Sequence, residues 1–106
     1  MGLTLQSLIE TAIRHRADAI ELEYVPEGLE VIYMKGDIGL GGVVADRESI
    51  RAIISELVTR AKLERRSHGA FKWAHGGKEY KIRAEQYESF GESAFRLILK
   101  KPKQRA

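Results

Sequence analysis

Residues Ala19–Val25 alternate strictly between apolar and charged or small side chains, and this alternation constrains the fold more than any other feature. The large apolar side chains of the run share one face, while Glu21 and Glu23 share the other. A two-residue period of this kind is typical of a strand with one face buried and one face in water. A Pro-Glu-Gly turn at 26–28 and a second β-prone run, Leu29–Met34, follow it. The sequence therefore predicts an antiparallel hairpin.

Two other segments have the 3.6-residue period of amphipathic helices. The first is predicted over about residues 5–15, with Thr4 as its N-cap. The second is predicted over about residues 47–63, with Asp46 as its N-cap. Each helix has a single apolar stripe, so each is expected to bury one side only.

Three further strands are predicted in the second half of the chain. Residues 70–75 and 78–86 flank a Gly-Gly pair at 76–77, which is a two-residue hairpin signal, and residues 93–100 form the last strand. The stretch 35–42 holds four glycines, and we interpret it as a flexible connection. The element order is then α-β-β-α-β-β-β. The predicted fold class is α+β, with two helices packed on one face of a mostly antiparallel sheet.

The length and the distribution of charge predict one folded unit with a basic tail. A chain of 106 residues has room for one core, and we expect a single α+β domain over residues 1–100 followed by a tail over 101–106. The formal net charge is 18 − 15 = +3. Four cations stand near the C-terminus: Lys100, Lys101, Lys103 and Arg105. Without them the balance is 14 − 15 = −1, so the basic character comes from the tail.

The sequence offers no catalytic or metal-binding motif. It has no cysteine, and none of its serines lies in a GxSxG motif. The glycine-rich stretch lacks the lysine and hydroxyl residue of a P-loop, and the three histidines lack the ligand spacing of a zinc site. We therefore predict that the protein is not an enzyme and that it has no catalytic residue, no metal and no cofactor.

No apolar run approaches the roughly 20 residues of a transmembrane helix, and the first residues lack the pattern of a signal peptide. We therefore expect no membrane insertion and a cytoplasmic location. The aromatic residues Phe71 and Trp73 align with the apolar face of the next strand, which indicates core packing rather than base stacking. Nucleic acid is not an expected partner.

Five segments, taken in order, resemble the regulatory N-terminal domain of type II secretion and type IV pilus assembly ATPases. Residues 8–23 resemble the family's opening helix and the S-D-I-H-L/I-E-P start of its first strand. Residues 29–36 resemble its vRyRvDG strand and turn, and residues 68–71 its q-D-G-r step. Residues 80–83 and 89–97 resemble its R-v-S and G-E…l-R-l close. The resemblance implies a bacterial, PAS-like domain that interacts with other proteins.

The sequence also departs from the family pattern. The family's histidine is Glu21 here, its serine is Ala17, and the proline that follows its acid is Tyr24. The 106 residues contain no Walker A or Walker B motif. We therefore expect a domain of this kind that occurs without the motor domain and does not hydrolyse ATP by the family's mechanism.

The resemblance also implies site residues. In the family, arginines of this domain approach the nucleotide phosphates across an interdomain cleft, and Arg83 and Arg96 occupy the matching positions. Strand parity places both on the face away from the core, where a guanidinium could bind phosphate or a partner. The alternative is that each pairs with an acid across the sheet. Glu21 and Glu23 are the candidate acids for contact with a partner.

The function expected from these observations is that of a non-catalytic binding or adaptor module. It would dock on a motor ATPase, on a secretion or pilus assembly component, or on a second copy of itself. Two alternatives stay open. A PAS-like sensor of a small molecule or nucleotide would need an apolar-lined pocket of about 300 Å³ or more. A weak polyanion binder would use the tail cations together with Arg65 and Arg66.

Overall fold

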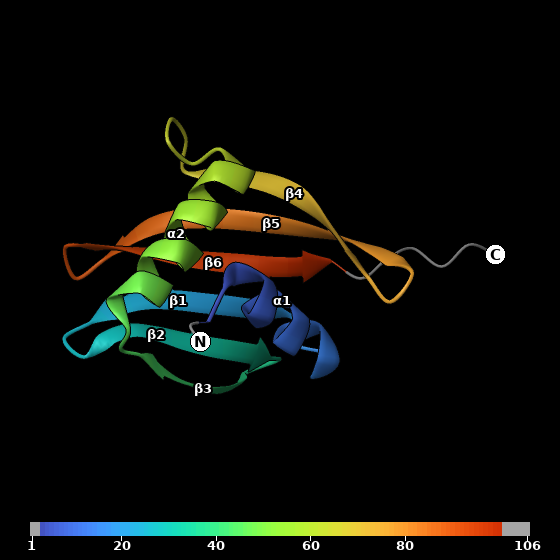
Figure 1. Cartoon of the computed structure of the whole chain (residues 1–106), viewed down its shortest axis with the longest axis horizontal. Coiled ribbons are helices and arrows are strands. Elements are labelled where there is room, and N and C mark those ends of the chain that lie inside the picture. The colour runs from blue at the N-terminus through green and yellow to red at the C-terminus, as the bar shows by residue number, and fades with distance from the viewer. Residues whose placement is uncertain (1–2, 101–106) are drawn as a thin grey trace.

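A six-stranded antiparallel sheet forms the body of the protein, and two helices lie on one of its faces (Figure 1). The structure is a computed structural model and describes residues 3–100. In chain order the elements are α1 (Leu5–Arg14), β1 (Ala19–Val25), β2 (Gly28–Lys35), β3 (Ile38–Val44), α2 (Arg47–Ala61), β4 (His68–His75), β5 (Lys78–Ser89) and β6 (Glu92–Lys100). The predicted fold class is confirmed, with one strand more than expected.

The strand order across the sheet is β3-β2-β1-β6-β5-β4. Hairpins join β1 to β2, β2 to β3, β4 to β5 and β5 to β6, and the two halves meet where β1 pairs with β6. The first and last predicted strands are therefore central neighbours, while β3 and β4 form the two edges. In Figure 1, α2 crosses the strands obliquely towards β4, and α1 lies nearer the β1 and β2 side.

Local capping fixes where each helix begins. The Thr4 side chain accepts a hydrogen bond from the Ser7 amide at 3.1 Å, and the Ser7 hydroxyl accepts one from the Thr4 amide at 2.9 Å, which completes a capping box. Asp46 caps α2 through the amide and hydroxyl of Ser49, at 3.2 and 2.6 Å. Both predicted N-caps are confirmed. Lys62, in the left-handed region with φ 56°, ends α2.

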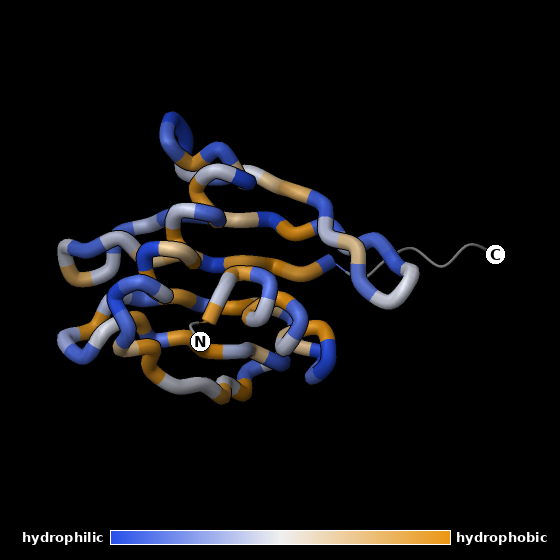
Figure 2. Tube along the Cα trace, in the orientation of Figure 1, coloured by the Kyte–Doolittle hydropathy of each residue, from blue (hydrophilic) through white to orange (hydrophobic). Residues whose placement is uncertain are grey.

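The core lies between the helices and the alternate residues of the strands that face them. Ile20 and Leu22 of β1 are fully buried there, as are Leu97 of β6 and Leu57 of α2. The same alternation is visible in Figure 2, where apolar and polar residues succeed one another along the central strands. The parity predicted for β1 and β6 is confirmed. The opposite face of the sheet carries no helix among residues 3–100, and we call it the open face.

The interpretation of residues 35–42 as a flexible connection is wrong, because Ile38–Val44 forms the edge strand β3. Its glycines lower the strand propensity, which hid the strand in the sequence. Gly41 is needed there, since a Cβ at this position would overlap the Val31 carbonyl oxygen of β2. Gly36, with φ 61°, turns the chain back from β2 to β3. The pair Gly36-Asp37 between two β-prone runs is the signal that could have predicted this hairpin.

Candidate functional site

The open face places two of the predicted site residues in direct contact. Glu21 of β1 and Arg96 of β6 are register partners, and the Arg96 Nη2 lies 3.1 Å from the Glu21 Oε2. The Arg96 guanidinium also lies over the Tyr87 ring, 5.8 Å from its centroid. Of the two roles that the sequence left open for Arg96, the structure places it in the ion pair across the sheet. Its charge is already neutralised by a carboxylate.

Glu23 and Tyr87 extend this polar cluster along the open face. The Ser89 hydroxyl of β5 donates a hydrogen bond of 2.6 Å to the Glu23 carboxylate. The pKa of Tyr87 is raised above 10.0, chiefly by burial and then by the negative charge of Glu21, with Arg96 acting in the opposite direction. Glu21 and Glu23 therefore both make side-chain contacts within the chain.

Arg83 stands apart from this cluster. It lies on the open face of β5, opposite Ile98 of β6, and its side chain is exposed with no acid within 4 Å among residues 3–100. Arg83 and Arg96 are diagonal neighbours on adjacent strands, so the two predicted arginines do share one patch. Only Arg83 keeps an unpaired charge there. Of the four tail cations, Lys100 ends β6, and Lys101, Lys103 and Arg105 lie outside the described residues.

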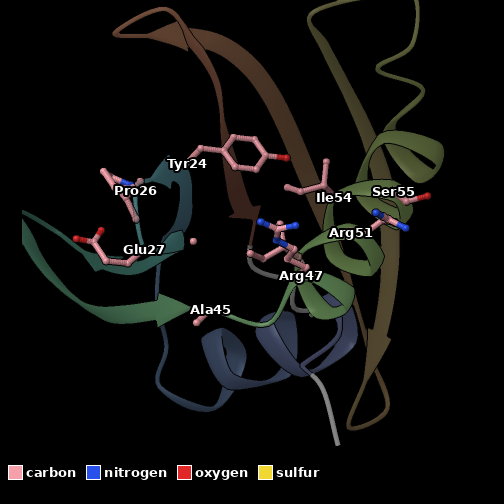
Figure 3. A pocket seen from close by; sticks show the side chains of 11 residues that line it. Tyr24, Pro26, Glu27, Ala45, Arg47, Arg51, Ile54 and Ser55 are labelled. Atoms are coloured by element: carbon pink, nitrogen blue, oxygen red, sulfur yellow. The ribbon is translucent and has the colours of Figure 1, made fainter.

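A cleft of about 690 Å³ lies between the β1–β2 turn and the first half of α2. Ile50 and Ile54 of α2 contribute apolar side chains to it, while its charged residues are Arg47, Arg51 and Glu27. Figure 3 shows the Tyr24 ring reaching from β1 toward Ile54. Burial raises the pKa of Tyr24 above 10.0, and the negative charge of Glu92 adds to the effect. Tyr24 is therefore neutral at physiological pH and can donate or accept a hydrogen bond in the cleft.

The two arginines of this cleft are unpaired, unlike the next arginine of the same helix. Arg47 and Arg51 are exposed and have no acid within 4 Å among residues 3–100. They stand four residues apart, a spacing at which like charges repel on a helix. Arg60, by contrast, pairs with Glu56 at 2.8 Å and lies 4.9 Å from the Trp73 ring centroid. Within residues 3–100, the start of α2 thus presents two arginines that form no ion pair, although Glu27 lines the same cleft.

An exposed aromatic residue lies close to the same cleft. Phe90, at the tip of the β5–β6 hairpin, is fully exposed, with a relative exposure of 102%. Its φ of 52° lies in the left-handed region, which is strained for an aromatic residue. A second hollow, of about 250 Å³, is lined by Phe90, Glu92 and the Tyr24–Pro26 segment, which also lines the α2 cleft. The two hollows therefore adjoin at that segment.

We call this end of the molecule the turn-end surface, and we define it by Tyr24, Pro26, Arg47, Arg51 and Phe90. It combines arginine, tyrosine and an exposed aromatic ring, the residue types that are most enriched at the energetic centres of protein interfaces. Sequence reasoning missed this surface. The signal was present in part, because Arg47 and Arg51 follow the predicted N-cap on the polar side of the helix.

A third hollow, of about 850 Å³, lies on the helix side of the β3 edge, beside the C-terminal end of α1. We call it the edge groove. Its lining is mostly apolar and consists of Thr11, His15, Ala17, Tyr33, Lys35, Gly36, Ile38, Leu40 and Gly41. Burial raises the pKa of Tyr33 above 10.0, and the neighbouring Thr11 hydroxyl opposes the shift. The volume exceeds the minimum expected of a sensor pocket, but Ile38 and Leu40 stay 66% and 74% exposed, so the groove is open on the strand side.

A further hollow, of about 530 Å³, is lined mostly by polar residues, among them Arg65 and Arg66. Among residues 3–100, no three His, Asp or Glu side chains cluster in a way that could hold a metal ion. Within the same span, neither helix has the length and hydropathy needed to cross a membrane.

No family model matches the sequence, and no curated protein sequence matches it. The fold is similar to part of the ATPase DotB of Legionella pneumophila, whose X-ray structure matches with a TM-score of 0.54 and 12% identity. The match covers 95% of this chain and 30% of the DotB chain. At this identity the likeness concerns the fold alone, and the chain spans less than a third of that ATPase.

Proposed function

We propose that the protein is a non-catalytic binding module that docks on a secretion or pilus motor ATPase or on a component of the same assembly. The observation that carries the proposal is the fold, which is similar to part of DotB over 95% of the chain. Five short segments of the sequence also resemble the regulatory N-terminal domain of secretion and pilus ATPases. A domain with this fold and no motor motif within its 106 residues is suited to contact a motor rather than to be one.

The side chains also favour binding over catalysis. Three tyrosines have a raised pKa and Asp46 a lowered one, and each shift has a structural cause in burial or helix capping. The Ser67 hydroxyl and the His68 Nδ1 are 3.5 Å apart, but both residues are exposed, and no third group orients the imidazole among residues 3–100. None of these groups forms a nucleophile activated by an adjacent, oriented base.

We assign the docking role to the turn-end surface because, within residues 3–100, its two arginines form no ion pair and its phenylalanine ring is fully exposed. A complementary partner surface would present carboxylates to Arg47 and Arg51 and an apolar pocket to Phe90. Guanidinium groups bind carboxylates in a bidentate manner, and such pairs fix orientation as well as affinity. The open face is a weaker candidate, since Glu21, Glu23 and Arg96 already contact partners within the chain.

The test titrates the chain with the purified secretion or pilus ATPase of the same organism. Formation of the complex is followed by analytical ultracentrifugation. The wild-type chain is expected to form a complex. The double variant Arg47→Glu and Arg51→Glu, and separately Phe90→Asn, are expected to weaken it at least tenfold, as for hot-spot residues. Asparagine suits the left-handed conformation at residue 90, so that variant keeps the fold while it removes the ring.

Two control variants make the result specific. Lys78→Glu changes charge by the same amount per site at an exposed turn, and Arg83→Glu changes it at the unpaired arginine of the open face. Neither is expected to weaken the complex. If Arg83→Glu alone abolishes binding, the docking surface is the open face. If no ATPase or assembly component binds the folded wild-type chain, the proposal is wrong.

A further inference from the structure

We propose that the β3 edge and the edge groove together bind an extended strand of a partner protein, apolar at alternating positions and acidic at its C-terminal end. The strand would pair antiparallel with β3 and become the seventh strand of the sheet. Its site is separate from the turn-end surface, and the inference does not depend on the proposed function.

The first observation is that β3 has none of the features that usually protect a sheet edge. Natural edge strands carry lysine, proline or a covering segment, which prevents pairing with other chains. Ile38–Val44 contains no charged residue and no proline. The other edge strand, β4, has Lys72 near its middle, paired with Glu79, and α2 packs against it with Trp73 buried. The β4 edge is therefore protected against pairing with another chain, whereas the β3 edge is not.

The second observation is that the exposed apolar side chains of the molecule gather at this edge. Of the six large apolar residues that are exposed among residues 3–100, three belong to β3: Ile38, Leu40 and Val43. Ile38 and Leu40 face the helix side, where they border the edge groove. A strand added to β3 would place every second side chain on that side. Those side chains could cover Leu40 and fill the groove, as in recognition by strand addition.

The charges of the groove indicate which end of an antiparallel added strand would carry an acidic residue. Its lining includes Lys35 and His15 and no acid. Lys35 stands opposite Ile38 in the β2–β3 register, at the N-terminal end of β3. The C-terminal end of a strand paired antiparallel with β3 would lie across Ile38 from Lys35, about 10 Å away in backbone spacing, a gap that a glutamate and a lysine side chain can span together. Asp18 forms no ion pair with Lys35 among residues 3–100, and its carboxylate accepts a hydrogen bond from the Gly36 amide at 2.8 Å.

Other occupants fit the geometry less well. A small molecule is usually held in a pocket that buries most of its surface, whereas Ile38 and Leu40 are largely exposed beside this groove. A second copy of the chain could pair through its own β3. A seven-residue β3–β3 contact is small beside the roughly 800 Å² that each partner of a stable interface buries. An extended segment of another protein can use the edge and the groove together.

The test uses two blocked heptapeptides, each with leucine and threonine in alternation, that carry a single glutamate either at the last or at the first position. Binding is followed on the whole chain by amide chemical shifts and by hydrogen exchange. The peptide with glutamate last is expected to bind at millimolar concentration or below and to protect β3 amides. It should bind about two- to fivefold more tightly than the peptide with glutamate first, which is the range expected from an exposed ion pair. In Lys35→Glu this preference should disappear or reverse.

Two substitutions of an exposed apolar residue by lysine separate this site from the turn-end surface. Leu40→Lys places a charge on the edge and is expected to abolish peptide binding, whereas Phe90→Lys is expected to leave it unchanged. Retention of binding in Leu40→Lys, or no binding of either peptide to the wild-type chain, would overturn the proposal. Chemical-shift changes at the groove residues without hydrogen-exchange protection of the β3 amides would assign the groove to small ligands instead. A wild-type dimer that Leu40→Lys dissociates would assign the edge to a second copy.

Discussion

Arg96 and Glu21 stand opposite each other on adjacent central strands and form an ion pair of 3.1 Å, although 75 residues separate them in the chain. The pair links β6 to β1, where the two hairpin-built halves of the sheet meet. It also neutralises Arg96, for which the sequence left two roles open: contact with phosphate or a partner, or pairing with an acid across the sheet. Arg47, Arg51 and Arg83, which are exposed and form no ion pair among residues 3–100, become stronger candidates than Arg96 for contact with a partner.

The first prediction concerns the strength of this pair. A double-mutant cycle with Glu21→Gln and Arg96→Met should give a coupling of only about 0.2–1 kcal/mol, as for other exposed ion pairs. The side chains are 44% and 29% exposed, so water and salt screen the charges. Urea unfolding at low and high salt measures the coupling, which should decrease as salt is added. A coupling of several kcal/mol would mean that the pair is a main support of the fold.

The second prediction compares two neighbouring glycines of β3. Gly41→Ala should destabilise the protein by about 1–3 kcal/mol, because the added methyl group overlaps the Val31 backbone. Gly42→Ala is the matched control, since a Cβ there meets nothing within 4 Å. It should be neutral or stabilising by up to about 1 kcal/mol. Thermal and urea unfolding measure the stability of both variants. Equal changes in the free energy of unfolding would contradict the register in which β3 pairs with β2.

The third prediction follows from the backbone of Phe90. Its ring is fully exposed and its φ is 52°, so the ring contributes little to stability while the backbone is strained. Phe90→Gly should therefore raise the free energy of unfolding by up to about 1 kcal/mol. Phe90→Ala keeps the strain and should leave it nearly unchanged. A destabilising Phe90→Gly would show that the ring packs in solution. It would also remove the argument that Phe90 is kept for binding.

The fourth prediction is a loss of stability at alkaline pH. Burial raises the pKa of Tyr24, Tyr33 and Tyr87 in the folded chain above 10.0, their usual value in an unfolded chain. The unfolded state therefore loses these protons first, and the free energy of unfolding falls as pH rises through and above 10. Urea unfolding from about pH 9 to about pH 11 should show this fall. Tyr33→Phe should make the fall in the free energy of unfolding smaller. An unchanged pH dependence in this variant would contradict a raised pKa of Tyr33 in the folded chain.

Much of the fold could be predicted because it depends on local periodicity. The alternation over β1 and the helical stripes of α1 and α2 each reflect a face that must be buried, and the caps Thr4 and Asp46 mark where helices begin. The edge strand β3 was missed because its glycines have low strand propensity. Gly41 is required there by the close approach of the Val31 backbone, a tertiary contact that the local sequence does not reveal. Its neighbour Gly36 provided the turn signal, but the surrounding glycines obscured it.

The candidate site was less accessible to sequence reasoning. Strand parity placed Arg83 and Arg96 on the open face, but it could not show that Glu21 lies within reach of Arg96, because the pairing of β1 with β6 is a long-range choice. The turn-end surface depends on three chain segments that meet only in the folded state. Phe90, in particular, has no sequence signal that separates an exposed aromatic residue from a buried one.

The most direct test of the docking proposal is site-specific photo-crosslinking to the purified ATPase. The chain has no cysteine, so Ser55→Cys in the α2 cleft can carry a single benzophenone label, and Lys78→Cys provides the matched position at an exposed turn. We predict a crosslink to the ATPase from residue 55, none from residue 78, and loss of the first when Arg47 and Arg51 are changed to glutamate. Equal crosslinking from both positions, or crosslinking from residue 78 alone, would contradict the docking proposal.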